Sequence, residues 1–121
     1  MTEILAMPGS FGALAQVSDQ PVGFVIALAV GPEAEILTLG VLPEFRRRGI
    51  ARHLLTWVID RLADATCQRL LLEVAEDNLA ARTLYGKLGF AAVARRPSYY
   101  RRSAGAKAAI VLARALRDRE G

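Results

Sequence analysis

The chain has 121 residues, of which 53% are hydrophobic and 23% are charged, and its formal net charge is +4. This apolar content excludes an intrinsically disordered protein, and the length predicts one domain, residues 1–121, that buries about 65% of the surface of its unfolded chain. No charge-free apolar stretch reaches about 18 residues, no signal-peptide pattern occurs, and one cysteine cannot form an internal disulfide, so we expect a cytoplasmic protein without a membrane segment.

The order of the elements predicts an α/β domain with a mixed, largely antiparallel sheet. In chain order we expect a strand at 12–17, a turn at 18–21, strands at 22–29 and 35–42, a helix at 49–63, a strand at 69–74, a helix at 79–88, and strands at 91–95 and 107–113. The first two strands form a hairpin, and the strand, helix and strand in the middle form a βαβ unit. The first helix has one apolar face, because Ile50, Leu54, Val58 and Leu62 recur every four residues.

A basic turn, Arg46-Arg47-Arg48-Gly49, joins the apolar run 36–42 to the first helix. The first N–H groups of a helix lack intrahelical partners and carry partial positive charge, so anions bind readily there. Gly49 lets the backbone approach a ligand, and the arginines add charge for phosphate oxygens. The turn predicts a pyrophosphate site, although a plain connection with solvated arginines has the same pattern. The glycine spacing fits neither a Walker loop nor a dinucleotide fingerprint.

Residues 69–90 predict a strand, a loop and a helix, with a carboxylate in an unusual place. Glu73 interrupts the apolar run 69–74: it is either an exposed side chain paired with Arg69 or Arg82, or a partly buried acid with a function, and its place in the run favours the second. Asn78 can cap the helix, and Gly89-Phe90 supplies a left-handed stop with an apolar contact. Periodicity alone predicts that one helical face carries Ala80, Ala81, Leu84, Tyr85 and Leu88, with Tyr85 as a core aromatic.

Both segments resemble the GNAT superfamily of acetyl-CoA-dependent N-acetyltransferases. Arg46-Arg47-Arg48-Gly49-Ile50-Ala51 is similar to the signature Gln/Arg-x-x-Gly-x-Gly/Ala of that family. Residues 72–90, from Leu-Glu-Val through Leu-Tyr to Leu-Gly-Phe, resemble the RimI-type branch, whose members acetylate the N-terminal amine of a small-subunit ribosomal protein. The resemblance runs from residue 12 to residue 112 and implies a GNAT-like fold.

The resemblance implies that acetyl-CoA enters where two central strands splay apart and that an amine attacks its thioester directly. Glu73 matches the general base of the branch, which acts through water, and Tyr85 matches the general acid that protonates the coenzyme A thiolate. A backbone N–H of residues 39–41 is implied to stabilise the oxyanion. The implied cofactor-binding residues are Leu39, Gly40, Val41, Arg46, Arg47, Arg48, Gly49, Ile50, Ala51, Arg52, Asn78 and Tyr85. For Asn78 a plain helix cap is the alternative. No metal is expected, since the chain has one histidine and one cysteine.

The beginning of the chain departs from the family pattern. Family members carry a strand and two helices before the first hairpin, whereas this chain has residues 1–10, so we expect those helices to be absent. Residues 4–7 could form the last turn of the second helix. An apolar cleft left open in this way favours self-association, so a homodimer is a hypothesis.

We predict that the chain transfers an acetyl group from acetyl-CoA to a primary amine, with a protein N-terminal α-amine as the favoured acceptor. An α-amine, with a pKa of about 7.7–8.0, loses its proton more easily than lysine near about 10.4. One alternative is a small-molecule amine, which would need an acidic lining, and another is a non-catalytic acyl-CoA-binding or regulatory module. A basic RNA-associated module is a third, from the arginines at 46–48, 95–96 and 101–102 beside Tyr99 and Tyr100, but we favour solvated or substrate-facing arginines over direct nucleic-acid binding.

Overall fold

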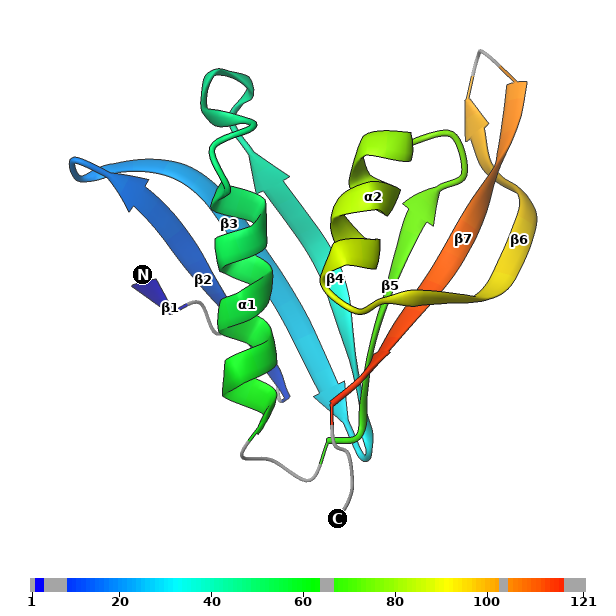
Figure 1. Cartoon of the computed structure of the whole chain (residues 1–121), viewed down its shortest axis with the longest axis horizontal. Coiled ribbons are helices and arrows are strands. Elements are labelled where there is room, and N and C mark those ends of the chain that lie inside the picture. Colours follow the sequence, from blue (N-terminus) through cyan, green and yellow to red (C-terminus); the bar gives the residue numbers. More distant parts are fainter. Residues whose placement is uncertain (1, 4–8, 64–66, 103–104, 117–121) are drawn as a thin grey trace.

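The computed structural model describes residues 2–3, 9–63, 67–102 and 105–116, with side chains described at 9–63, 67–97 and 108–116. Within these residues seven strands form one sheet in the order β1-β2-β3-β4-β5-β7-β6 (Figure 1). The elements in chain order are β1 (Thr2–Glu3), β2 (Ser10–Val17), β3 (Gln20–Val30), β4 (Glu33–Val41), the 3-10 turn η1 (Pro43–Phe45), α1 (Ile50–Ala63), β5 (Arg69–Ala75), α2 (Leu79–Lys87), β6 (Ala91–Arg102) and β7 (Gly105–Ala115).

The centre of the sheet is a βαβ unit whose two strands separate. β4 and β5 are parallel, whereas the neighbouring pairs are antiparallel, so the predicted mixed, largely antiparallel sheet is confirmed. The parallel pairing begins at Glu33 with Arg69 and ends at Glu35 with Leu71. Beyond that level β4 continues to Val41 and β5 to Ala75 without pairing to each other, and Figure 1 shows the two strands diverging as a V.

A β-bulge lies in β4 at the level where the strands part. Ala27 of β3 pairs with Ile36, but the preceding Ile26 pairs with Thr38, so Leu37 is an extra residue in β4. A bulge bends its strand and increases the local twist, which explains why β4 leaves β5 here. It also shifts the alternation of faces, so that Ile36 and then Leu39 contact the core.

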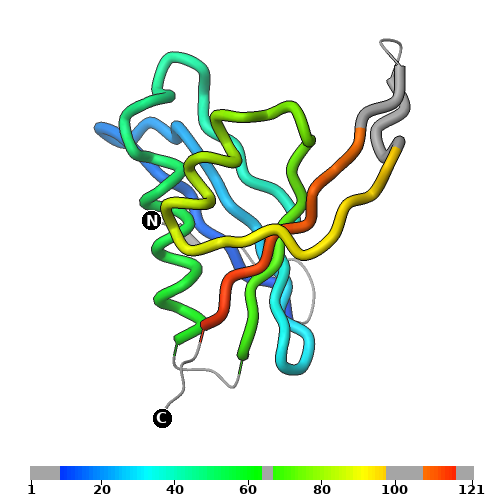
Figure 2. The backbone as a smooth tube through the Cα atoms, turned by 45° about the vertical axis from the view of Figure 1, so that its right-hand side comes forward, coloured from blue at the N-terminus to red at the C-terminus, as the bar shows by residue number. Residues whose placement is uncertain are grey.

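Both helices pack on one face of the sheet, as Figure 1 and the turned view of Figure 2 show. The predicted apolar face of α1 is confirmed, with Leu54, Leu55, Val58 and Leu62 buried against the strands. No residue of α2 is fully buried; its contribution to the core comes from half-buried side chains. The opposite face of β3 and β4 is more exposed: Val30 is 65% and Leu42 39% accessible.

Some predicted boundaries are wrong. The turn predicted at 18–21 consists of Ser18 and Asp19, both with positive φ, while Gln20 and Pro21 belong to β3. Positive φ at both central residues is typical of a type I′ hairpin turn, which matches the twist of the flanking strands. β1 was not predicted, and the helical turn suggested for residues 4–7 lies outside the described residues.

The last hairpin is longer than its pattern predicts. The strands predicted at 91–95 and 107–113 extend over Ala91–Arg102 and Gly105–Ala115. Pairing between them continues to Arg102 and Gly105, across a register break between Arg96 and Tyr100. Pro97 falls in that break on the edge strand of the sheet, a position where a missing N–H group is tolerated.

Candidate active site

A cleft of about 760 Å³ lies on the helical face of the sheet, between the end of β4, the turn before α1, and α2. Most of the residues predicted to bind the cofactor line it: Leu39, Gly40, Val41, Arg46, Arg47, Gly49, Ile50, Ala51, Arg52 and Tyr85. Arg48, Glu73 and Asn78 do not line it. The structure therefore gathers residues from β4, α1 and α2 around one space.

The turn before α1 brings the residues of the first helical turn to the wall of this cleft. Arg47 has φ of 64° and Gly49 has φ of 79°, so both are left-handed. The carbonyl of Gly49 accepts from the N–H of His53 at 2.9 Å, which makes Gly49 the N-cap of α1. The N–H groups of Ile50, Ala51 and Arg52 consequently lack intrahelical acceptors. No atom lies within 4 Å of the place of a Cβ on Gly49, so its positive φ, rather than crowding, requires glycine.

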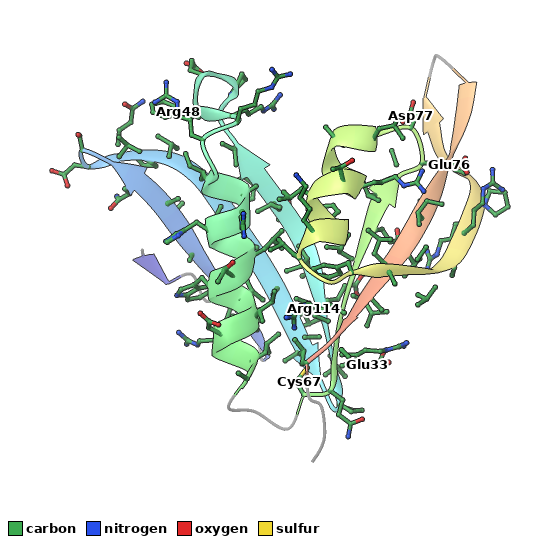
Figure 3. All side chains as sticks on the ribbon, viewed as in Figure 1. Glu33, Arg48, Cys67, Glu76, Asp77 and Arg114 are labelled. Carbon is green, nitrogen blue, oxygen red and sulfur yellow. The ribbon has the colours of Figure 1, made fainter. Side chains whose placement is uncertain are left out.

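The arginines of the turn have separate positions. Arg46 Nε donates to the carbonyl of Val41 at 3.2 Å, which ties the turn to the end of β4. The guanidinium of Arg48 lies 5.0 Å from the centre of the Phe45 ring, and Arg48 lines a second groove of about 570 Å³ with His53 and the β2–β3 turn. Figure 3 shows Arg48 in the loop that leads to α1. Arg46 and Arg47, by contrast, line the main cleft.

The edge of β4 that faces the gap between β4 and β5 carries main-chain N–H groups outside the sheet ladder of the described residues. Leu42 donates to the carbonyl of Val22 on β3 at 2.8 Å. Because the direction of the N–H groups alternates along a strand, those of Leu39 and Val41 point away from β3, toward β5. The pairing of β4 with β5 has ended by Glu35, so the sheet ladder of the described residues does not use these two donors.

The ends of α2 are fixed by local contacts that also hold Tyr85. Asn78 Oδ1 accepts from the N–H of Ala81 at 3.2 Å, which is an N-cap. At the other end Phe90 donates to the carbonyl of Tyr85 at 3.0 Å, and Gly89, with φ of 94°, donates to Gly86 at 3.1 Å. These two bonds are the Schellman motif, and the tilted rings of Tyr85 and Phe90, 5.9 Å apart, supply its apolar contact. Burial raises the pKa of the Tyr85 phenol, so it stays protonated near neutral pH.

Glu73 faces the other side of the sheet. Its neighbours Leu72 and Val74 are buried against the helices, and strand alternation directs Glu73 to the opposite face. The side chain is only 17% exposed, and its Oε2 lies 3.2 Å from Nε of Arg96 on β6. Glu73 comes two residues after Leu71, the last residue of β5 paired with β4, so it lies beside the gap between the two strands.

The partners suggested for an exposed Glu73 are wrong. Arg69 pairs with Glu33 at 2.6 Å, and Arg82 Nη1 donates to the carbonyl of Glu76 at 2.8 Å. Both arginines therefore have other acceptors, because the register of the sheet and the loop before α2 bring different oxygens to them. Sequence proximity within the segment did not reveal Arg96, which comes from a later strand.

Several residues of the cleft were not predicted as binding residues: Phe45, Ala80, Ala81, Thr83, Leu84 and Lys87. Those of α2 recur at helical spacing, so Ala80, Thr83 or Leu84, and Lys87 lie on one face of the helix. That spacing, combined with the position of Tyr85, is the signal that could have identified them. Lys87, the last residue of α2, lies at the C-terminal end of this helix face.

Two further observations concern the part of the chain that the structure describes. It contains no group of three or more His, Cys, Asp or Glu side chains placed to hold a metal ion, and Cys67 is buried. None of its helices has the length and apolar content needed to cross a bilayer.

Comparison with known proteins gives consistent relatives. A model of the acetyltransferase (GNAT) family matches residues 2–90. The ribosomal protein bS18-alanine N-acetyltransferase of Salmonella typhimurium is 39% identical over 95 residues, which cover 78% of this chain and 64% of that relative. The chain thus spans less than two thirds of the length of that relative.

Solved structures show the same arrangement of elements. The crystal structure of the ribosomal-protein-S18-alanine N-acetyltransferase from Escherichia coli is similar with a TM-score of 0.89 and 30% identity, over 95% of this chain and 74% of that one. The structure of Arabidopsis thaliana NAA60 in complex with acetyl-CoA has a TM-score of 0.75 and 24% identity, over 88% of this chain and 74% of that one. At 24% identity, the similarity to NAA60 shows a shared fold alone.

Proposed function

The chain belongs to the GNAT family of acetyltransferases, and from that premise we propose that it transfers the acetyl group of acetyl-CoA to the N-terminal α-amine of a protein. The observation that carries the proposal is the cleft that joins the first turn of α1 to the unpaired edge of β4. The N–H groups in the first turn of α1 suit a pyrophosphate, and the N–H groups at the edge of β4 suit a reacting thioester carbonyl.

The cofactor site follows from this chain's own donors. The N–H groups of Ile50, Ala51 and Arg52 would hold the pyrophosphate, with Arg46 and Arg47 adding positive charge. Leu39, Gly40 and Val41 would line the pantetheine arm along β4. The volume of about 760 Å³ lies in the usual range for cofactor pockets. Arg48 and Asn78 stay predicted cofactor contacts, although neither lines the cleft.

The gap between β4 and β5 connects the two faces of the sheet, so groups bound on opposite faces can react there. The thioester would approach from the helical face, with its carbonyl oxygen near the N–H groups of Leu39 and Val41, which stabilise the negative charge that develops. The amine would come from the face of Glu73, which takes its proton through water. The new C–N bond forms as the C–S bond breaks, and Tyr85 gives its proton to the departing thiolate.

The acceptor proposal rests on the relatives and on acid–base chemistry. The Salmonella typhimurium relative is named as an N-acetyltransferase of an alanine of ribosomal protein bS18. A ribosomal acceptor would place this chain in the cytoplasm. Direct nucleic-acid binding is less favoured, because the arginines at 95 and 96 are engaged by Glu76 and Glu73.

We also propose that the chain forms a homodimer through the β3 side of the sheet face opposite the helices, away from β5 and Glu73. This face exposes Val30 and Leu42, with Phe24, Ile26 and Leu28 half-buried beside them. No helix of the described residues covers it (Figure 1). Apolar surface of this kind favours association.

The enzyme proposal is tested by thiol release from acetyl-CoA with peptides that begin with alanine, beside the same peptides with a blocked N-terminus. We expect turnover with the free amine and none with the blocked one. Calorimetric binding of acetyl-CoA without turnover on any peptide would instead support the acyl-CoA-binding module. Turnover on polyamines but not on peptides would favour a small-molecule acceptor.

Replacing Glu73 tests its role as the base. We expect Glu73→Gln to lower kcat by about 10²–10⁴-fold while leaving the affinity for acetyl-CoA unchanged, because the side chain is on the other face from the cleft. Glu76→Gln is the matched control, since Glu76 is exposed and pairs with Arg95. A Glu73→Gln variant with wild-type kcat would remove Glu73 from the base role.

A further inference from the structure

Arg96 reaches Glu73 across an intervening strand. The sheet order is β5-β7-β6, so β7 separates the strand of Glu73 from that of Arg96. Arg96 is opposite Ala109 of β7, and Ala109 is opposite Ala75 of β5, so these three residues form one cross-strand row. Glu73 is two residues before Ala75 and on the same face, which puts its carboxylate diagonally across from the guanidinium. The result is the contact of 3.2 Å between Nε and Oε2.

The intervening residue is small. Ala109 is completely buried, and a methyl group leaves room for a long side chain to lie over β7. Glu73 is 17% exposed whereas Arg96 is 56% exposed, so the arginine closes over a carboxylate that the sheet already shields. An ion pair with one shielded member is screened less than a pair of fully exposed side chains.

The preceding arginine provides a natural comparison. Arg95 points to the helical face and pairs with Glu76, with Nε to Oε2 at 2.9 Å (Figure 3 labels Glu76 at the edge of the molecule). Successive residues of a strand face opposite sides, so two adjacent arginines are directed to two different glutamates. Only Arg96 is on the face from which the amine would approach.

We infer that Arg96 is a positioning residue that fixes the Glu73 carboxylate beside the gap between β4 and β5, so that it can receive the proton of the attacking amine. This inference rests on the proposed function, in which Glu73 is the base. A glutamate side chain has several rotatable bonds, and the Arg96 contact selects one placement of its carboxylate. Small displacements of a reacting group are costly in rate, even when the group itself is intact.

The test is a double-mutant cycle on the full chain with acetyl-CoA and an alanine-initiated peptide. We expect Arg96→Ala to lower kcat by about 10–100-fold and to leave KM for acetyl-CoA within about two-fold, because the cofactor cleft is on the other face. Arg96→Lys should recover part of the loss, since it keeps the charge but not the geometry of the guanidinium. Arg95→Ala is the matched control and should retain the wild-type kcat.

The second arm of the cycle separates positioning from a general structural role. In a Glu73→Gln background, Arg96→Ala should change kcat by less than about two-fold, because the carboxylate that it positions is gone. Thermal unfolding of each variant shows whether it is folded, and Arg96→Gln replaces Arg96→Ala if the latter is not. The inference is overturned if Arg96→Ala has the wild-type kcat, or if Arg96→Ala lowers kcat equally in the wild-type and Glu73→Gln backgrounds. In either case a lower kcat of the Glu73→Gln single variant still supports Glu73 as the base. Absence of wild-type turnover, or full turnover of Glu73→Gln, overturns both.

Discussion

Tyr85 shows at the scale of one residue how a helix ending serves a site. Its carbonyl and its ring both take part in the motif that ends α2, and the residue also lines the cleft. Periodicity alone predicted a core aromatic, and the side chain does pack against the core. The proposed role as the acid is compatible with this packing, because the burial that fixes the ring also keeps its hydroxyl protonated.

The raised pKa of Tyr85 predicts a loss of stability at alkaline pH. In the unfolded chain a tyrosine ionises near its ordinary pKa of about 10, whereas the folded state holds the proton to higher pH. The contribution of Tyr85 to the free energy of unfolding is therefore fully present below about pH 10 and is lost as the pH rises through the pKa of the folded state. Urea unfolding between about pH 8 and about pH 11 should show a steeper loss of unfolding free energy in the wild type than in Tyr85→Phe. Equal slopes in the two proteins would contradict this effect of burial.

At the scale of elements, α2 is defined by its two ends. The cap by Asn78 and the stop at Gly89 are local features that four or five consecutive residues encode, which is why the sequence predicted this helix within one residue. The bulge at Leu37 is different. It depends on how β4 pairs with β3, and no pattern within 35–42 indicated an extra residue.

Replacing Asn78 separates the two interpretations of that residue. Asn78→Ala should lower the free energy of unfolding by about 1 kcal/mol, because the N–H of Ala81 loses its acceptor. Asn78→Asp keeps a capping oxygen and should be close to the wild type in stability. If Asn78 also contacts the cofactor, calorimetry should show weaker acetyl-CoA binding for Asn78→Asp, whose amide group is gone. Unchanged acetyl-CoA binding by Asn78→Asp would indicate that Asn78 acts only as the helix cap.

At the scale of the whole molecule, the helices of the described residues cover one sheet face, and none of them covers the other. The proposed homodimer predicts that sedimentation velocity at high protein concentration detects a species of twice the monomer mass. Val30→Lys should shift the distribution to the monomer, because it puts a charge on the proposed interface, where Val30 is 65% exposed. Val93→Lys is the matched control, at a valine on β6 that is 51% exposed. A monomer at all concentrations would contradict the proposal.

The amino-acid sequence by itself determined what depends on neighbours along the chain. The apolar spacing of α1, the glycine with positive φ before it, and both ends of α2 follow from short segments whose geometry is local. These features were enough to identify the family and to select most of the residues that line the cleft.

Only the tertiary structure decided which groups from distant segments meet. The gap between β4 and β5 arises from a bulge, the side of the sheet that Glu73 faces depends on strand register, and its partner Arg96 comes from beyond another strand. Register and pairing are set by packing of the whole sheet, since a shift of one residue would turn every side chain to the other face.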